Sequence, residues 1–284
     1  MEQQFKQIDL GDLKPFAKGG TGECYRINED TIIKLYYEGF PLDRILHEKD
    51  GARAALVAGV PTAISFDLVQ ARNRLGVMFE LIQGRTLSEL VVQDPDRAPQ
   101  LGGILASIGK TLHNAEVRKT DLPSPTLAIR KELVKIDYMS EEAVHRIEQY
   151  LDLLDQEKHY VHGDLHPNNV VVSVNGPMLV DMGGFSVGSA MFDLASLRFS
   201  LFESPDAKKE GRSSFNGMSH EEEQAFYQGF MQTYFGGEMD PAMEEPLYMV
   251  TLLKKIRFER LYGARYPEEY CADIRREVRA VFDK

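Results

Sequence analysis

The feature of this 284-residue chain that most limits its fold is a pair of short apolar runs, each of which adjoins a polar loop. The loop HGDLHPNN, residues 162–169, leads into the apolar run 170–174, and the run 178–180 leads into Asp181. Short apolar runs bounded by turn residues are typical of strands. If the two strands lie side by side, Asp164, Asn169 and Asp181 meet at one strand end.

Two carboxylates and an amide supply only oxygen ligands, and Mg²⁺ prefers oxygen and retains waters and substrate phosphates as further partners. The segment therefore predicts a magnesium site. One alternative is that these residues merely form turns. A second is a zinc site made by His159, His162 and His166, which irregular histidine spacing and the lack of a nearby cysteine disfavour.

The spacing Asp-x4-Asn followed by Asp-x-Gly is that of a kinase catalytic loop and its metal-binding aspartate. With its flanking residues, HGDLHPNN followed by VDMGG closely resembles the aminoglycoside phosphotransferase and choline kinase superfamily, which has the protein-kinase-like fold. The resemblance implies that Asp164 orients the substrate hydroxyl or accepts its proton. It also implies that Asn169 and Asp181 hold Mg²⁺, with Met182 at the place of the protein-kinase phenylalanine.

Hydrophobic periodicity predicts an α+β chain with a small β-rich N-lobe and a larger, mostly helical C-lobe. We expect a nucleotide-binding lobe at 1–84 and, at 85–284, a helical lobe with the catalytic loop and acceptor site. The N-lobe is expected to hold strands at 24–27, 31–37, 62–69 and 74–82 and a helix at 41–59. The C-lobe is expected to hold strands at 170–174 and 178–180, a helix opened by the capping-box pattern 86–89, and helices near 97–116, 126–136, 141–155, 193–202, 219–234, 241–262 and 267–282.

A lysine and a glutamate stand on apolar faces of the predicted N-lobe. Lys34 shares a strand face with Ile32 and Tyr36, and Glu48 lies on the apolar stripe of the 41–59 helix. Each charge is costly there unless it is paired. The simplest pairing joins Lys34 to Glu48, the ion pair that places a kinase lysine on the α- and β-phosphates. The alternative is two solvated charges at element edges.

Two further segments supply candidates for nucleotide binding. The turn with Gly20, Thr21 and Gly22 could cover the phosphates, because glycine lets the backbone approach closely. It departs from the protein-kinase glycine pattern, since Tyr25 holds the third glycine position, and a plain glycine-rich turn is the alternative. Residues 78–87 resemble the family's hinge between lobes, which implies adenine contacts from the Glu80 carbonyl and the Ile82 amide. An ordinary strand-to-helix turn is the alternative there.

Composition excludes several classes of protein. The formal net charge is −11, which argues against binding to a nucleic-acid backbone. The sequence contains no run of about 18 apolar residues, so no membrane span is predicted. Two cysteines cannot form a disulfide framework, and the N-terminus lacks a signal-peptide pattern, so we expect a cytoplasmic protein. We expect a monomer or weak dimer.

Together these patterns predict a Mg-ATP-dependent phosphotransferase, with GTP not excluded as the donor. No activation segment ending in Ala-Pro-Glu separates Asp181 from Asp193, so we expect a small hydroxyl acceptor rather than a protein. Asp193 is expected to cap a helix or brace the catalytic loop. The alternative function is a non-catalytic or protein-directed kinase-like module that binds nucleotide in a regulatory role.

The acceptor is expected to be a hydroxylated amine, aminoglycoside-like or choline-like. Residues 86–284 carry a net formal charge of −10, which would attract a cation, although surface acidity also serves solubility. The acidic residues on which this expectation rests are Asp152, Asp155, Glu222, Glu223, Glu244, Glu245 and Glu259.

Overall fold

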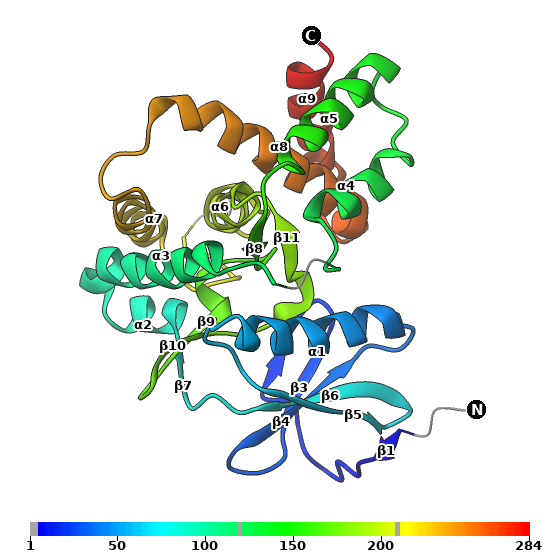
Figure 1. The fold of residues 1–284 in the computed structure, drawn as a ribbon, viewed down its shortest axis with the longest axis vertical. Coiled ribbons are helices and arrows are strands. Elements are labelled where there is room, and N and C mark those ends of the chain that lie inside the picture. Colours follow the sequence, from blue (N-terminus) through cyan, green and yellow to red (C-terminus); the bar gives the residue numbers. More distant parts are fainter. Residues whose placement is uncertain (1–4, 119–120, 208–210) are drawn as a thin grey trace.

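The computed structural model describes residues 5–118, 121–207 and 211–284. Figure 1 shows a sheet-rich N-terminal lobe below a mostly helical C-terminal lobe, which confirms the predicted two-lobed α+β fold. The chain crosses between the lobes near residues 81–83, after the last strand of the N-terminal sheet.

The N-terminal lobe is a six-stranded sheet with the order β1-β5-β6-β4-β3-β2, covered on one face by a helix. Every strand pair is antiparallel except β1 with β5. The elements are β1 (Lys6–Gln7), β2 (Ala17–Lys18), β3 (Gly22–Arg26), β4 (Thr31–Tyr36), α1 (Leu42–Val57), β5 (Ser65–Ala71) and β6 (Arg74–Glu80).

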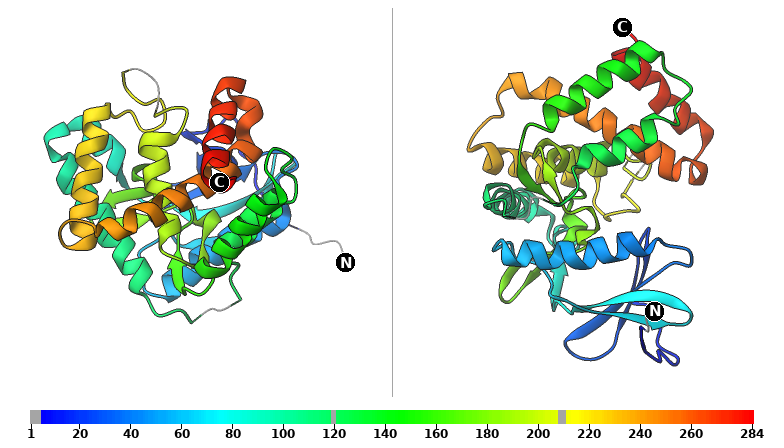
Figure 2. Two further views of the ribbon diagram at one scale, coloured as in Figure 1. Left: turned by 90° about the horizontal axis from the view of Figure 1, so that it is seen from above. Right: turned by 45° about the vertical axis from the view of Figure 1, so that its right-hand side comes forward.

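Side-chain alternation along β4 divides its residues between two environments. Ile33 and Leu35 are fully buried in a small apolar cluster together with Val69. Tyr36 instead belongs to the main core, with the α1 residue Ile45. Lys34 shares the face of Tyr36, so the strand's period of two carries its charge toward α1. The right view in Figure 2 shows α1 between the sheet and the C-terminal lobe.

The C-terminal lobe surrounds two small sheets with helices. A three-stranded sheet has the order β10-β9-β7, and β11 pairs with β8. The strands are β7 (Gly84–Thr86), β8 (His159–Val161), β9 (Val170–Ser173), β10 (Gly176–Leu179) and β11 (Ser186–Gly188). The helices are α2 (Leu87–Gln93), α3 (Ala98–Asn114), α4 (Pro125–Leu133), α5 (Glu141–Leu154), α6 (Met191–Arg198), α7 (His220–Phe235), α8 (Glu244–Tyr262) and α9 (Glu268–Phe282). The predicted capping box is present, since Thr86 and Glu89 bond each other's backbone amides at the start of α2.

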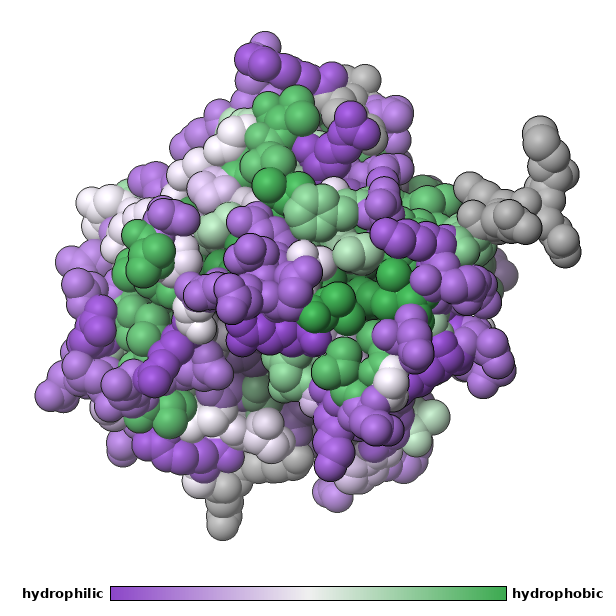
Figure 3. All heavy atoms as spheres, turned by 90° about the horizontal axis from the view of Figure 1, so that it is seen from below, coloured by the Kyte–Doolittle hydropathy of each residue, from purple (hydrophilic) through white to green (hydrophobic). Residues whose placement is uncertain are grey.

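No helix in the described part of the chain has the length and apolar character that crossing a membrane requires. Figure 3 views the molecule from the side of the N-terminal sheet. Apolar side chains there are interspersed with hydrophilic ones.

Helices α3 and α7 approach each other through glycine. A Cβ atom on Gly102 would lie 2.0 Å from the carbonyl oxygen of Phe226, and one on Gly229 would lie 2.0 Å from that of Pro99. Since backbone atoms cannot yield as a flexible side chain can, each contact requires a residue without a side chain. This close packing also fixes the position of the strands beside the 162–169 loop, because α3 contacts β8 and β10.

We therefore expect Gly102→Ala to destabilise the fold by roughly 1–3 kcal/mol, as overpacking of a well-packed interior does. Chemical denaturation monitored by circular dichroism would measure this loss. Gly237→Ala is the matched control, because a Cβ there meets no atom within 4 Å. Equal stability of the two variants would show that the two helices can move apart and accommodate a Cβ atom at position 102 without loss of stability.

The segment 211–218 is bonded to the start of α7 and contacts the loop 162–169. Glu222 accepts two hydrogen bonds from Arg212, of 2.9 and 2.8 Å, and Glu223 accepts one of 2.8 Å from Asn216. Phe215 then stands edge-on to the His166 ring at 5.0 Å, and its carbonyl oxygen accepts a hydrogen bond from Asn168. Two of the acidic residues noted in the sequence thus serve the packing of this segment.

Burial raises the pKa of Glu223 from 4.5 to about 7, although the Asn216 hydrogen bond opposes the shift. Because the folded-state pKa exceeds the unfolded one, this group favours folding most at low pH. That contribution is lost as pH rises from about 4.5 to about 7. We expect Glu223→Gln to raise the free energy of unfolding by roughly 2–3 kcal/mol at pH 8 and hardly at pH 4.5. Denaturation curves at the two pH values measure the difference, and a gain of equal size at both would contradict it.

Candidate active site

The loop after β8 is shaped by a glycine and a buried carboxylate. Gly163 has a φ of +80°, and a Cβ there would lie 2.5 Å from the Gly184 carbonyl oxygen. The carboxylate of Asp193 accepts hydrogen bonds of 2.8 Å from the backbone amides of both His162 and Gly163. The prediction that Asp193 braces this loop is therefore confirmed.

A second layer holds Asp193 itself. Its carboxylate is fully buried and also contacts His113 Nε2 at 3.0 Å, while the other nitrogen of that ring contacts the Tyr234 hydroxyl at 2.7 Å. A buried carboxylate is tolerated when its lone pairs are occupied by donors. His113 from α3 and Tyr234 from α7 thereby connect the closely packed helix pair to the loop.

One side-chain bond and one backbone bond of Asn169 bring Asp164, Asn169 and Asp181 together. The Asn169 amide nitrogen donates to the Asp164 carbonyl oxygen at 2.9 Å, and the Asn169 carbonyl oxygen accepts from Val180 at 3.0 Å. Asp181 follows directly and takes a left-handed conformation with a φ of 60° and a ψ of 63°. The three residues thus meet beside the paired strands β9 and β10, as the sequence predicts.

The donor atoms of this group suit a magnesium ion. A carbonyl oxygen can only accept, so the atom of Asn169 that faces Asp164 is the amide nitrogen, which leaves the amide oxygen for a cation. Asp181 uses Oδ1 to pair with Lys34, and its side chain is 48% exposed. Oxygen atoms at an open edge match the preference of Mg²⁺ for oxygen ligands, waters and phosphates.

Lys34 lies at the centre of a buried cluster of charges. Its Nζ atom donates to Glu48 Oε1 at 2.7 Å and to Asp181 Oδ1 at 2.8 Å. The second Glu48 oxygen accepts a hydrogen bond of 2.9 Å from the Tyr36 hydroxyl. The predicted ion pair is present, and the structure adds two partners that the sequence analysis did not assign, Tyr36 and Asp181.

The pKa values in this cluster follow from the same contacts. Burial alone would lower the pKa of Lys34, but Asp181 and Glu48 outweigh it and hold the value above its ordinary range. Burial raises the pKa of Glu48 although Lys34 opposes the shift, whereas Lys34 overcomes burial to lower the pKa of Asp181. The cluster therefore keeps a charged ammonium beside the magnesium-binding candidates.

Asp164 faces a second lysine, from α8, that the sequence analysis did not identify. Lys254 Nζ donates to Asp164 Oδ1 at 3.1 Å and to the Ser196 hydroxyl at 2.6 Å, and His166 Nε2 lies 3.3 Å from Asp164 Oδ2. Burial would raise the pKa of Asp164, but Lys254 and His166 hold it well below its ordinary value. No local motif marks Lys254, because it lies 90 residues from its partner.

The glycine turn lies between β2 and β3. Gly19 donates to the Gly22 carbonyl oxygen at 2.9 Å, and Thr21 accepts from the Tyr37 amide at 3.0 Å. Gly22 pairs with Tyr36 in the ladder, and its Cβ would lie 2.5 Å from the Leu35 carbonyl oxygen. Sheet packing therefore requires glycine at position 22. A Cβ atom on Gly20 would meet no atom within 4 Å, so packing does not require glycine at position 20.

The hinge candidates lie where the chain leaves β6. The Glu80 amide donates to Ile64, and the Leu81 amide donates to Asp30. The Ile82 amide has no hydrogen-bond partner among the described residues. That donor is consequently available to a ligand.

The zinc alternative is not supported by the positions of the three histidines. His159 Nδ1 contacts the His113 carbonyl oxygen at 2.9 Å, and His162 Nε2 contacts that of Val180 at 3.0 Å. His166 Nε2 faces the Asn169 amide nitrogen at 3.0 Å. Across residues 5–118, 121–207 and 211–284, no three His, Cys, Asp or Glu side chains gather as a metal site.

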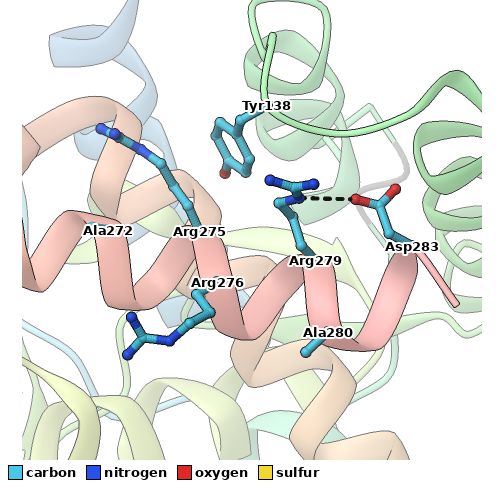
Figure 4. Close-up of a pocket in the computed structure, with 7 residues that line it drawn as sticks. All are labelled: Tyr138, Ala272, Arg275, Arg276, Arg279, Ala280 and Asp283. Atoms are coloured by element: carbon cyan, nitrogen blue, oxygen red, sulfur yellow. Dashed lines mark hydrogen bonds and ion pairs between the residues drawn. The ribbon is translucent and has the colours of Figure 1, made fainter.

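Two hollows on the surface differ in their relation to these residues. One, of about 500 Å³, lies along α9 and contains Arg275, Arg276 and Arg279 (Figure 4). Each of these arginines already pairs with a carboxylate, as Arg279 does with Asp283 at 3.3 Å. The other, of about 390 Å³, includes Gly163 and Lys254 and therefore adjoins Asp164. We take the second as the candidate acceptor cleft.

Comparison with solved structures supports the fold. A choline/ethanolamine kinase family protein from Mesorhizobium loti matches with a TM-score of 0.61 at 15% identity, covering 97% of this chain and 89% of that one. An aminoglycoside phosphotransferase in ternary complex with AMP-PNP and hygromycin B matches with a TM-score of 0.62 at 13% identity, covering 96% and 93%. An amicoumacin kinase in complex with AMP-PNP, Ca²⁺ and Ami matches with a TM-score of 0.60 at 15% identity, covering 96% and 90%.

No curated protein matches the chain in sequence. The profile of the phosphotransferase enzyme family does match, over residues 12–243, which include the glycine turn, Lys34 and the whole catalytic segment. This chain belongs to the phosphotransferase enzyme family.

Proposed function

We propose that this phosphotransferase moves the γ-phosphoryl group of Mg-ATP to a hydroxyl group of a small molecule, with GTP as the alternative donor. The observation that carries the proposal is the meeting of Asp164, Asn169 and Asp181 beside the Lys34–Glu48 pair. Phosphoryl transfer needs positioning and charge neutralisation more than covalent chemistry, and this group offers both.

In this proposal residues 1–84 form the nucleotide-binding lobe and residues 85–284 the lobe with the catalytic loop and acceptor site. Lys34, oriented by Glu48, contacts the α- and β-phosphates. The turn with Gly20, Thr21 and Gly22 covers them, and the adenine bonds to the Glu80 carbonyl and the Ile82 amide. The solved structures with AMP-PNP support a nucleotide in this fold.

Asp164 is proposed as the group that receives the acceptor proton. Its lowered pKa keeps the carboxylate ionised at neutral pH. As the acceptor oxygen forms its bond to the γ-phosphorus, its proton passes to Asp164, and the bond from phosphorus to the β–γ bridging oxygen breaks to release ADP. Asn169 and Asp181 would hold Mg²⁺, which supplies neutralisation of the phosphate charge when bound.

A small acceptor is favoured by the short path after Asp181. The turn Met182–Gly184 and strand β11 lead directly into α6, which begins at Met191. A kinase that binds peptide needs a long activation segment there, so this geometry disfavours the protein-directed alternative. The family match disfavours the non-catalytic alternative.

The acidic residues that suggested a cationic acceptor lie outside the lining of the candidate acceptor cleft. Most of them pair with basic or polar side chains: Asp152 and Asp155 with Arg130, Glu222 with Arg212, Glu223 with Asn216, Glu244 with Arg198 and Glu259 with Arg275. None of them, Glu245 included, is among the residues that line the acceptor cleft. The electrostatic argument for a hydroxylated amine is therefore lost, and the amine remains one arm of an acceptor screen.

The proposal is tested by measuring ADP release from Mg-ATP across a panel of hydroxylated amines, neutral sugars and hydroxy acids. Acceptor-dependent ADP release with a new phosphate ester, seen by mass spectrometry, supports it. Phosphorylation confined to protein substrates would favour the protein-directed alternative. Nucleotide binding without release of ADP on any acceptor would favour the regulatory one.

We expect Asp164→Asn and Asp181→Asn to fail in different ways. Asp164→Asn removes the proton acceptor and should lower kcat by about 10²–10⁴-fold while Mg-AMP-PNP still binds. Asp181→Asn removes the carboxylate ligand and should weaken Mg-AMP-PNP binding more than Asp164→Asn does. Calorimetric titration of both variants compares the affinities. Equal affinities would mean that the two roles are wrongly assigned.

We expect Lys34→Met and Glu48→Gln to be non-additive in kcat/KM for ATP. Because Lys34 also pairs with Asp181, its loss should cost more than that of Glu48. The double variant should resemble Lys34→Met alone, with a coupling of about 1 kcal/mol or more. The control pairs Lys34→Met with Glu116→Gln, since Glu116 is exposed and contacts Arg118 instead. Additivity in both double variants would mean that the Lys34–Glu48 contact contributes nothing to turnover.

A further inference from the structure

The acceptor cleft beside Asp164 has an unexpected set of charges. Its volume of about 390 Å³ lies in the range of small-molecule sites. It is bounded by α1, the segment 123–132 with α4, the catalytic loop at Gly163, and α8. Because Lys254 lines the cleft and bonds Asp164, a molecule in the cleft lies next to the proposed proton acceptor.

Basic side chains outnumber acidic ones in this cleft. The basic residues that line it are Arg44, Lys131, Lys254 and Arg257, and the acidic ones are Asp43 and Glu132. The Glu132 carboxylate lies 3.1 Å from the Lys135 ammonium, which offsets part of its charge. The lining is thus electropositive in a chain whose formal net charge is −11. A local field of one sign attracts a ligand group of the other.

Arg257 is the strongest indication of what binds there. It belongs to α8, its side chain is partly buried, and no hydrogen bond or ion pair is found for it among the described residues. Other arginines of similar burial are paired, for example Arg74, which donates to Glu23 and to two backbone carbonyls. A guanidinium carries five donors, and withdrawing it from water without an acceptor is costly.

Arg44 and Lys254 complete the pattern. Arg44 lines the same cleft from α1. Burial and the Arg44 charge lower the pKa of Arg257, although the charges of Asp164 and Glu132 oppose the shift. Lys254 is already occupied by Asp164 and Ser196, so it sets the position of the reacting carboxylate. The guanidinium of Arg257 is the less exposed cation, and none of its N–H groups donates a hydrogen bond within the described residues. Two parallel N–H groups of a guanidinium match an oxyanion.

We propose that the acceptor of this enzyme carries an oxyanion group, a carboxylate or a phosphate, in addition to its reactive hydroxyl. Arg257 binds the oxyanion, Arg44 and Lys131 add attraction at the mouth of the cleft, and the hydroxyl of the same molecule reaches Asp164. This inference rests on the proposed function, because it assigns the substrate class of that site.

The test uses acceptors that share a skeleton and differ in charge. Glycerate, glycerol 3-phosphate, glycerol and 3-amino-1,2-propanediol form one such set, and larger hydroxy acids with their neutral amides form a second. ADP release from Mg-ATP is measured with each. Turnover that prefers the carboxylate or the phosphate members supports the proposal and identifies which oxyanion is bound.

Turnover only with neutral or amine members would overturn the oxyanion assignment and leave the phosphotransferase function intact. If no member of either set and no compound of the wider panel supports ADP release, the result would contradict the proposed function itself. This inference would then be contradicted too, because it rests on that function. The two failures are therefore distinguishable.

With the best oxyanion acceptor, Arg257→Met should raise its KM at least tenfold, with a smaller change in kcat and in the KM for ATP. Arg257→Lys should restore part of the loss, because it keeps the charge but not the paired donors. Arg279→Met is the matched control, since Arg279 is paired with Asp283 in the hollow along α9. Calorimetry with Mg-AMP-PNP shows whether each variant is folded. An unchanged acceptor KM in a folded Arg257→Met would overturn the role of Arg257.

Discussion

The buried contact of the Lys34 ammonium with two carboxylates is the interaction on which the rest of the site depends. Lys34 comes from β4 and Glu48 from α1, while Asp181 belongs to the C-terminal lobe. An unpaired charge would be costly at the depth of Lys34 and Glu48, and each offsets the burial of the other, while the half-exposed Asp181 adds a second carboxylate to the ammonium. Tyr36 occupies the remaining Glu48 oxygen, which fixes the carboxylate. The same ammonium thus ties the two lobes together and presents a positive charge where phosphates are proposed to lie.

A second set of contacts holds the catalytic loop at a fixed distance from that cluster. The buried Asp193 carboxylate accepts hydrogen bonds from the backbone amides of His162 and Gly163, and the His113 ring of α3 contacts the same carboxylate. On the outer side, Lys254 holds Asp164 from α8. Groups that act in phosphoryl transfer must be placed before the substrate arrives, and here buried backbone contacts provide that placement.

Much of the fold and of the site could be predicted from the sequence because the decisive patterns are local. The helix of α1, the capping box at Thr86 and the metal-binding candidates all follow from spacing within short segments. The short strands β7, β8 and β11 could not, because they exist only through pairing with distant strands. Lys254 and Arg257 were missed for a related reason, since nothing along α8 shows which of its charges face Asp164. For the acceptor, the net charge of −10 over residues 86–284 does not describe the lining of one cleft, so the cationic acceptor stays a prediction without support from the positions of the acidic residues.

The central claim is that the cluster around Lys34 and Asp181 forms a site for a nucleotide together with its magnesium ion. The most direct measurement is calorimetric titration of the unmodified chain with AMP-PNP, first with excess Mg²⁺ and then with a chelator. The account predicts binding that weakens at least about tenfold when Mg²⁺ is removed, because a carboxylate site repels free phosphates that no cation neutralises. Affinity that is the same with and without Mg²⁺, or no binding in either, would contradict it.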